Sequence, residues 1–273
     1  MKLSLPGNFL TILVFLSAKL FFINLLYAEQ NDNLRILSLS AAATNILNQL
    51  EYPPVAIDQY GTITSQIPFP EVIGKGSAIS LEKVKELQIN CALIWYYQDD
   101  VERLLKKNNI RVIKIPTLNL SSYPELLDQL AKLSNREHKG MQLKKEFMAT
   151  IDKLQDEINQ KKKVKVYFEI YSEWRAIGNN SYLGEILQFA GASCPSEKSG
   201  IISPESIMEF SPDIIFFVEE SGDKREISRR VALSSSAAVR NNRVYPVSRK
   251  FCTEGLALLE SIDFFVNKIE EAR

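Results

Sequence analysis

Two short segments of the chain carry the same arrangement of a serine followed by a glutamate. Ser80-Leu81-Glu82 returns as Ser203-Pro204-Glu205, and the shared spacing of 123 residues (203 − 80) continues without a gap into an apolar run in each copy. A serine in this place caps a helix with its hydroxyl, and the helix dipole favours a carboxylate in the first turn. Each copy is therefore predicted as a capped helix followed by a buried strand. Glu82 and Glu205 could serve only as helix-end stabilisers, but their recurrence also predicts one exposed anion on each of two related halves.

Aromatic residues gather where the predicted strands end. Tyr60 follows one short strand, Trp95 and Tyr96 end another, Trp174 follows a third and Phe251 follows the last. In α/β folds the carboxyl ends of parallel strands border the ligand-binding crevice. Because aromatic rings offer a large contact area with a polar tip, this set predicts a site for a flat, largely apolar macrocycle. The alternative is that most of these rings pack in the core.

The sequence offers few residues for catalysis or for binding a bare metal ion. His138 is the only histidine and lies in the charged run 136–139, which is typical of a solvated helix surface. There is no Gly-x-Ser-x-Gly motif, although Asp58, Glu169 and Glu173 could form a carboxylate pair in an exported hydrolase. We therefore expect a binding protein and not an enzyme, with no metal ligands and no cofactor of its own.

Charge and cysteine content exclude further classes. With 33 basic and 33 acidic residues, the chain carries no excess positive charge for binding nucleic acid. Three scattered cysteines are too few for a zinc cluster or a disulfide scaffold. Cys91 lies in an apolar run and is predicted as a buried thiol, whereas Cys194 and Cys252 could form a disulfide in an oxidising compartment.

The first 28 residues have the pattern of a secretory signal peptide. Lys2 precedes a mostly apolar stretch from Phe9 to Leu26, and Ala28 is a small residue at a cleavage point. The stretch is also about long enough to span a bilayer as an uncleaved anchor, but Lys19 in its middle disfavours that alternative. Because no cysteine precedes Cys91, we expect no lipoprotein-type anchor. These features predict an exported, periplasmic protein.

Predicted strands and helices alternate on both sides of one long amphipathic helix. Apolar residues from Leu143 to Ile158 recur at spacings of three and four, and no proline interrupts 135–161. The alternation favours an α/β fold class with two Rossmann-like lobes, each with a mostly parallel sheet. The expected divisions are a signal peptide at 1–28, an N-terminal lobe at 29–134, a connecting backbone helix at 135–163 and a C-terminal lobe at 164–273.

The order of several segments carries a family resemblance. A strand at Arg35–Ser40 precedes Ala43–Leu47, Ser80-Leu81-Glu82 follows, and Gly178–Leu187 comes before the second Ser-x-Glu unit. This ordered set resembles the periplasmic substrate-binding proteins of ABC importers for cobalamin, iron-siderophores and haem. The resemblance implies a class III fold, one large metal-chelate ligand in the cleft and little change of shape on binding. It also implies a monomer whose two outer-tip glutamates contact arginines of an inner-membrane permease dimer with its ATPase subunits.

The resemblance also bears on the ligand. Trp95 and Tyr60 occupy the places of a pocket tryptophan and a pocket tyrosine in cobalamin-binding members, whereas the motif at Lys250-Phe251 differs from theirs. The segment 74–79 lacks the arginine that hydroxamate-siderophore binders use and the tyrosine expected for a haem ligand. The resemblance therefore favours cobalamin or a related corrinoid, and a ferric siderophore or haem remains the alternative.

Overall fold

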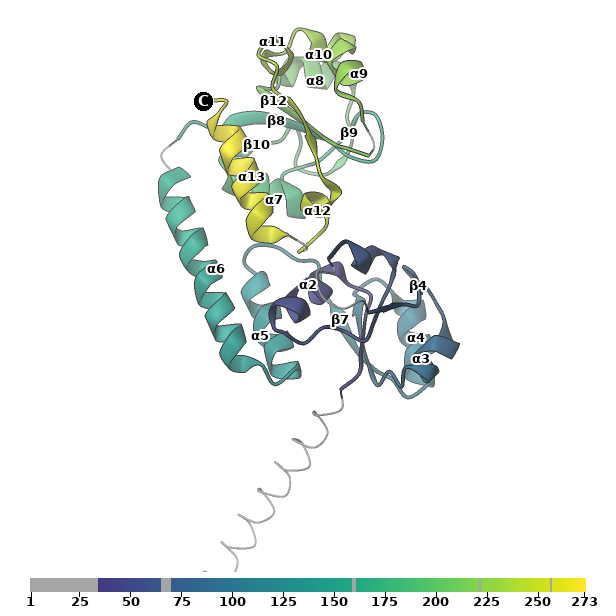
Figure 1. The fold of residues 1–273 in the computed structure, drawn as a ribbon. Coiled ribbons are helices and arrows are strands. Elements are labelled where there is room, and N and C mark those ends of the chain that lie inside the picture. Colours follow the sequence, from purple (N-terminus) through teal and green to yellow (C-terminus); the bar gives the residue numbers. More distant parts are fainter. Residues whose placement is uncertain (1–33, 65–69, 159–160, 221, 256) are drawn as a thin grey trace, which may run out of the picture.

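Two α/β lobes, one from each half of the chain, are joined along one side by the long helix α6 (Glu137–Ile158; Figure 1). This computed structural model describes residues 34–64, 70–158, 161–220, 222–255 and 257–273. The predicted signal peptide at 1–28 lies outside the described residues. In the described ranges, no helix combines the length and the apolar character that crossing a bilayer requires.

The N-terminal lobe is built around a five-stranded parallel sheet in the order β3-β2-β1-β6-β7. Its central strand β1 (Ile36–Ser38) is entirely buried, as expected where helices cover both faces of a parallel sheet. The hydroxyl of Ser40 accepts a hydrogen bond from the Ala43 N–H (3.3 Å) and so caps the first helix directly after that strand. The other elements are α2 (Ala41–Gln49), β2 (Ala56–Ile57), η1 (Gln59–Thr64), β3 (Glu71–Val72), β4 (Gly74–Lys75), β5 (Ala78–Ile79), α3 (Leu81–Glu86), β6 (Cys91–Trp95), α4 (Asp99–Lys107), β7 (Arg111–Ile115) and α5 (Tyr123–Leu133).

The C-terminal lobe contains a second sheet, in the order β11-β9-β8-β12-β13, with β10 paired to β8. Strands β8, β12 and β13 are parallel, and the short strands β9 and β11 pair antiparallel at one edge. Two lobes with mostly parallel sheets and one connecting helix confirm the fold class expected from the sequence. The elements are β8 (Val164–Glu169), β9 (Arg175–Ala176), α7 (Tyr182–Phe189), β10 (Ala192–Ser193), β11 (Gly200–Ile201), α8 (Pro204–Phe210), β12 (Ile214–Val218), α9 (Lys224–Arg229), α10 (Val231–Ser234), α11 (Ala237–Arg240), β13 (Val244–Val247), α12 (Arg249–Cys252) and α13 (Leu258–Glu270).

The duplicated sequence units occupy matching places in the two lobes. In the first, Ser80 caps α3 by accepting from the Lys83 N–H (3.2 Å), and in the second, Ser203 caps α8 by accepting from the Ser206 N–H (3.1 Å). Strands β6 and β12 then keep the same 123-residue spacing (214 − 91) from first residue to last. Each unit is a capped helix followed by a buried strand, as the repeat predicts.

Helix α6 is the structural link between the lobes. Its 22 residues correspond to a length of about 33 Å, so one helix reaches from one lobe to the other. Near its start Gly140 lies against α5 so closely that a Cβ there would come within 2.4 Å of the Cβ of Ala131. Phe147 is buried and its ring lies 4.7 Å from that of Tyr123. The helix is therefore packed firmly onto the N-terminal lobe.

The lobes also share part of their apolar interior. One continuous cluster of buried side chains contains Leu118 of the N-terminal lobe together with Leu183 and Leu258 of the C-terminal lobe. A shared, close-packed core resists large relative movement. The expected small change of shape on ligand binding remains a prediction.

Candidate ligand-binding cleft

A cleft of about 470 Å³ lies between the two lobes. Its walls come from residues that follow the carboxyl ends of β1, β2 and β6 in one lobe and of β8, β12 and β13 in the other. The last residues of the duplicated strands, Trp95 and Val218, both line it. The cleft thus forms where the topology of two facing parallel sheets places a ligand site.

Aromatic side chains form the N-terminal wall of the cleft. Tyr60, Trp95 and Tyr97 line it, and the rings of Trp95 and Tyr97 are stacked with centroids 6.4 Å apart. Buried Gln98 shapes the turn after β6 by accepting a hydrogen bond from the Trp95 N–H through its Oε1 (2.9 Å). Partial burial in the cleft, together with the nearby acidic group of Glu254, raises the pKa of the Tyr97 hydroxyl. This hydroxyl therefore stays neutral and can donate a hydrogen bond.

Asp58 holds together the loops behind this wall. The residue is 2 % exposed, and its carboxylate accepts hydrogen bonds from the N–H groups of Tyr60 (3.1 Å), Gly61 (3.0 Å) and Gly76 (3.2 Å). Burial raises the pKa of Asp58, and the three N–H donors oppose that rise. Gly76 has φ +58°, a conformation that suits glycine. Asp58 therefore fixes the position of Tyr60 and of the β4–β5 hairpin at the cleft.

The C-terminal wall mixes apolar and polar groups. Ile170 and Tyr171 follow β8, and Arg249, Thr253 and Glu254 follow β13. Tyr171 is 73 % exposed and has φ +68°, so its ring projects from a sharply turned loop. Arg249 lies 4.0 Å from a carboxylate oxygen of Glu220, which offsets part of its charge. This wall can contact both a ring system and polar groups at its edge.

Three of the predicted ligand-binding aromatics do not line the cleft. Tyr96 is half exposed and packs edge-on against Tyr97, because neighbouring residues after a strand point in different directions. Phe251 is stacked on Phe264 of α13, with centroids 5.2 Å apart, and belongs to the core. The hypothesis that Tyr96, Trp174 and Phe251 contact ligand stays a prediction without support from their placement.

Trp174 is held elsewhere by a buried ion pair. Its ring lies under the guanidinium of Arg230, 5.1 Å from the charge centre, and its backbone N–H donates to Glu169 Oε2 (2.9 Å). The same Glu169 oxygen accepts from Arg230 (2.6 Å) and from the hydroxyl of Tyr167 (2.6 Å). Glu173 also lies near Arg230, at 3.6 Å. Glu169 and Glu173 are thus engaged with one arginine and do not face Asp58 as a catalytic carboxylate pair would.

The cleft residues that the sequence reasoning did not select as ligand contacts include Tyr171, Arg249 and Glu254, and Tyr97 was considered only as part of the aromatic run 95–97. The useful signal is position relative to strand ends. Tyr97 and Tyr171 each lie two residues beyond the end of a parallel strand, and Arg249 lies two beyond another. Counting outward from the end of every predicted strand would have found these three, whereas nothing local marks Glu254.

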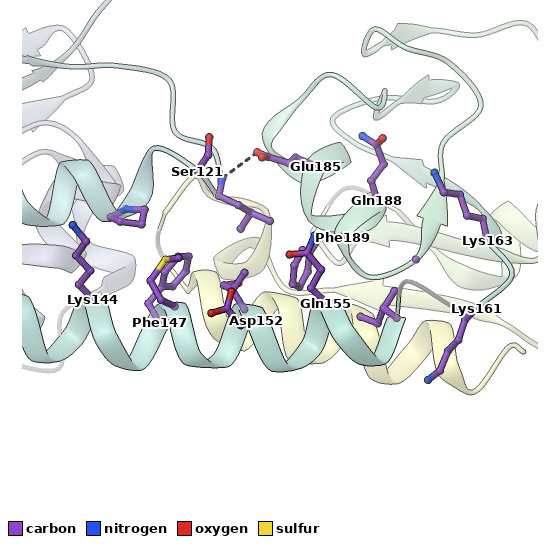
Figure 2. Close-up of a pocket in the computed structure, with 16 residues that line it drawn as sticks. Ser121, Lys144, Phe147, Asp152, Gln155, Lys161, Lys163, Glu185, Gln188 and Phe189 are labelled. Atoms are coloured by element: carbon purple, nitrogen blue, oxygen red, sulfur yellow. Dashed lines mark hydrogen bonds between the residues drawn. The ribbon is translucent and has the colours of Figure 1, made fainter.

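A larger cavity of about 810 Å³ lies on the opposite side of the molecule, between α6, α7 and the loop before α5 (Figure 2). It exists because a straight helix bridges two rounded lobes. Two of the lysines that line it are paired within the protein, Lys144 with Asp128 and Lys161 with Glu270 (2.9 Å). Its walls include no parallel-strand ends, so the cleft is the better candidate site despite its smaller volume.

The paired glutamates lie on the surface and do not line the cleft. Glu82 and Glu205 are exposed in the first turns of α3 and α8, which lie at opposite ends of the molecule in Figure 1. Within the described part of the chain, neither carboxylate forms an ion pair with another side chain. Both anions are therefore accessible to a partner.

Bare-metal and disulfide chemistry receive no support from the described residues. No group of three or more histidine, cysteine, aspartate or glutamate side chains is found there that could hold a metal ion, and His138 is exposed. All three cysteines are free thiols, so the pairing considered for Cys194 and Cys252 is not formed; Cys194 is buried beside the Asn179 loop. Burial raises the pKa of the Cys252 thiol, at the edge of the cleft, to about 12, which keeps it protonated.

Two α/β lobes, a bridging helix and an interlobe cleft are the architecture of a two-lobed solute-binding protein. The model of the periplasmic binding protein family matches residues 36–249, and the chain belongs to that family. No curated protein matches the sequence significantly.

Solved structures share this fold at low sequence identity. The haem-binding protein RhuT from Roseiflexus sp. RS-1 matches with a TM-score of 0.76 and 16 % identity, covering 88 % of this chain and 99 % of its own. The vitamin B12-binding protein BtuF of Vibrio cholerae gives 0.74 and 16 %, covering 87 % and 97 %. The haem-binding protein HutB of Vibrio cholerae gives 0.70 and 23 %, covering 87 % and 98 %. These likenesses confirm the fold expected from the family resemblance.

Proposed function

We propose that the chain is the periplasmic substrate-binding component of an ABC importer and that its ligand is a large metal chelate, cobalamin or a related corrinoid. The observation that carries the proposal is the aromatic interlobe cleft, which presents Tyr60, Trp95, Tyr97 and Tyr171 at the ends of facing strands. Flat faces of rings favour a flat macrocycle. The structural neighbours named for vitamin B12 and for haem support the same ligand class.

The charges of the cleft favour a corrinoid over an anionic chelate. The charged residues lining it are Asp58, Glu254 and Arg249, and Arg249 already faces Glu220 at 4.0 Å. An anionic siderophore, or haem with its two carboxylates, would enter without enough cationic partners, and a buried anion without a partner is costly. A corrinoid carries amide side chains at its edge, which hydroxyls such as those of Tyr97 and Thr253 can satisfy.

Haem is the second candidate, supported by the three cleft tyrosines. Tyr60, Tyr97 and Tyr171 place phenol groups along the cleft, and tyrosine is one of the side chains that hold haem iron. Arg249 offers a partner for one haem carboxylate. The raised pKa of Tyr97 opposes the phenolate form that iron prefers, so haem ranks below the corrinoid.

A ligand panel tests the proposal. The chain without residues 1–28 is incubated with cyanocobalamin, haem and a ferric hydroxamate siderophore, separated from free ligand, and titrated by calorimetry. We expect retention of cobalamin with one ligand per chain. Retention of haem with a shifted Soret band would support the second candidate, and retention of none would refute metal-chelate binding.

We further propose that Glu82 and Glu205 dock the loaded protein, acting as a monomer, onto the two halves of a permease dimer that carries ATPase subunits. A binding protein with related lobes presents matching anions to a twofold-symmetric partner in this way. Arginine–carboxylate contacts can be bidentate and so set orientation as well as attraction. The export of the protein to the periplasm through a cleaved segment at 1–28 belongs to the same proposal.

The docking role is tested with a matched pair of double variants. Glu82→Ala with Glu205→Ala should retain ligand binding but sharply reduce uptake by the reconstituted importer. The control is Glu86→Ala with Glu209→Ala, because these exposed glutamates lie on the same two helices and keep the same 123-residue spacing (209 − 86). Equal uptake by both double variants would leave Glu82 and Glu205 as helix-end stabilisers only.

A further inference from the structure

Two acidic side chains of the C-terminal lobe reach across to one short backbone segment of the N-terminal lobe. Glu254 accepts a hydrogen bond from the Leu118 N–H, and Glu185 Oε2 accepts one from the Leu120 N–H (3.1 Å). Leu118 and Leu120 lie in the loop between β7 and α5. Glu254 lines the cleft, whereas Glu185 lines the cavity behind it, where Figure 2 shows its bond to this loop. The loop is therefore held from the cleft side and from the rear.

Gly255 makes the lobes touch at the same place. It has φ +71°, and a Cβ at this position would lie 2.5 Å from the Cβ of Ala42 and 2.8 Å from Cδ2 of Leu118. Its N–H donates to the hydroxyl of Tyr182 (2.9 Å), and its carbonyl accepts from Asn45 Nδ2 across the lobe boundary (3.0 Å). The backbone of Gly255 therefore packs closely against Ala42 and Leu118 of the N-terminal lobe.

The carboxyl groups of Glu185 and Glu254 are partly buried and have no cationic partner among the described residues. Burial raises the pKa of both, opposed by the backbone N–H that each accepts. A glutamate in the first turn of a helix gains from the helix dipole, which accounts for Glu185 near the start of α7 without any bond to the other lobe. It does not account for two carboxylates meeting N–H groups two residues apart in the opposite lobe.

We propose that Glu185 and Glu254 form an interlobe clamp on residues 118–120 that fixes the width of the cleft. They are positioning residues: Glu185 reaches no part of the cleft, so any effect of it on ligand binding must pass through the arrangement of the lobes. The clamp keeps the cleft preformed, which lowers the cost of ordering the protein when ligand binds. The effect on ligand rests on the proposed function, whereas the clamp itself does not.

Glu185 is the informative position for the test. Glu185→Ala removes the acceptor, Glu185→Asp withdraws it by one methylene, and Glu185→Gln keeps a carbonyl oxygen in its place. Asp152→Ala is the matched control, because Asp152 lines the same cavity on α6 (Figure 2) and makes no bond across the lobes to any residue that the structure describes. The aspartate variant keeps the test decisive should the alanine variant fold poorly.

Two readouts separate the clamp from a simple loss of stability. Amide hydrogen exchange of the ligand-free protein should accelerate at Leu120 in the Ala and Asp variants, and remain as in the parent in the Gln and control variants. Release of bound cyanocobalamin, or of haem if haem is retained, should become about tenfold faster in the same two variants, since a hydrogen bond to a charged group is lost.

Unchanged exchange at Leu120 would overturn the clamp. Faster exchange with unchanged ligand release would overturn its role in setting the cleft, because the bond would then be broken without consequence. If the parent retained neither ligand, the proposed function would fail, whereas amide exchange of the ligand-free variants would still decide whether the clamp holds residues 118–120.

Discussion

The close approach of Gly255 to the N-terminal lobe makes a quantitative prediction for Gly255→Ala. The added methyl group would meet the Cβ of Ala42 at 2.5 Å, in a backbone conformation with φ +71°. An L-residue in the left-handed region costs about 1–2 kcal/mol, and overpacking a filled interior costs about 1–3 kcal/mol. The free energy of unfolding should therefore fall by about 2–5 kcal/mol.

Because the obstructing atoms belong to the other lobe, the strain should also appear as separation of the lobes. Urea unfolding followed by circular dichroism measures the loss of stability, and small-angle scattering measures the increase in radius of gyration. Gly200→Ala is the control, since a Cβ there has no heavy atom within 4 Å and φ is not positive, so it should stay within about 0.5 kcal/mol of the parent. A loss below about 1 kcal/mol at Gly255, or no larger than at Gly200, would show that the lobes are not in contact as described.

Three further predictions follow from the packing. Trp95→Ala should weaken binding of the retained ligand about thirtyfold, whereas Trp174→Ala should change it less than about threefold, as measured by calorimetry. Arg230→Ala should lower the free energy of unfolding in urea by about 3 kcal/mol, because it leaves buried Glu169 without its cation. It should also shift the fluorescence of Trp174, whose ring Arg230 covers. An unchanged urea midpoint would contradict this prediction. Burial raises the pKa of Glu185 above 4.5, so its contribution to stability is present below pH 4.5 and is lost as the pH rises through the raised pKa. The stability of Glu185→Gln relative to the parent should therefore increase between pH 4 and pH 7. Urea titrations at the two pH values would contradict this if the difference between variant and parent stayed constant.

Local patterns in the sequence were enough to predict the repeated architecture. The serine caps at Ser80 and Ser203 use hydroxyls and N–H groups three residues apart, so the helix starts are encoded within one turn. The apolar runs that became β6 and β12 are contiguous, and the period of α6 is visible from Leu143 to Ile158. The division into lobes at 134 and 164 remains a prediction at the level of single residues.

The ligand-facing side chains were only partly predictable, because direction depends on partners distant in the chain. Tyr60 and Trp95 reached the cleft, as their places after strands suggested. Trp174 follows a strand in the same way, but Arg230, which lies between α9 and α10 and 56 residues later (230 − 174), holds its ring. Phe251 likewise packs on Phe264 of the next helix. A strand end predicts that a residue lies near the cleft, not which way its ring turns.

By itself, the sequence determined the fold, since secondary structure, the internal repeat and the bridging helix follow from residue types at short spacings. Only the tertiary structure decided the lobe contact, in which Glu254 meets the Leu118 N–H over a separation of 136 residues and Glu185 meets the Leu120 N–H over 65. The sequence cannot predict which backbone N–H a glutamate will bind, because every residue other than proline offers the same donor. Their pairing is set by how the sheets and α6 place the two lobes, and so is the width of the cleft between them.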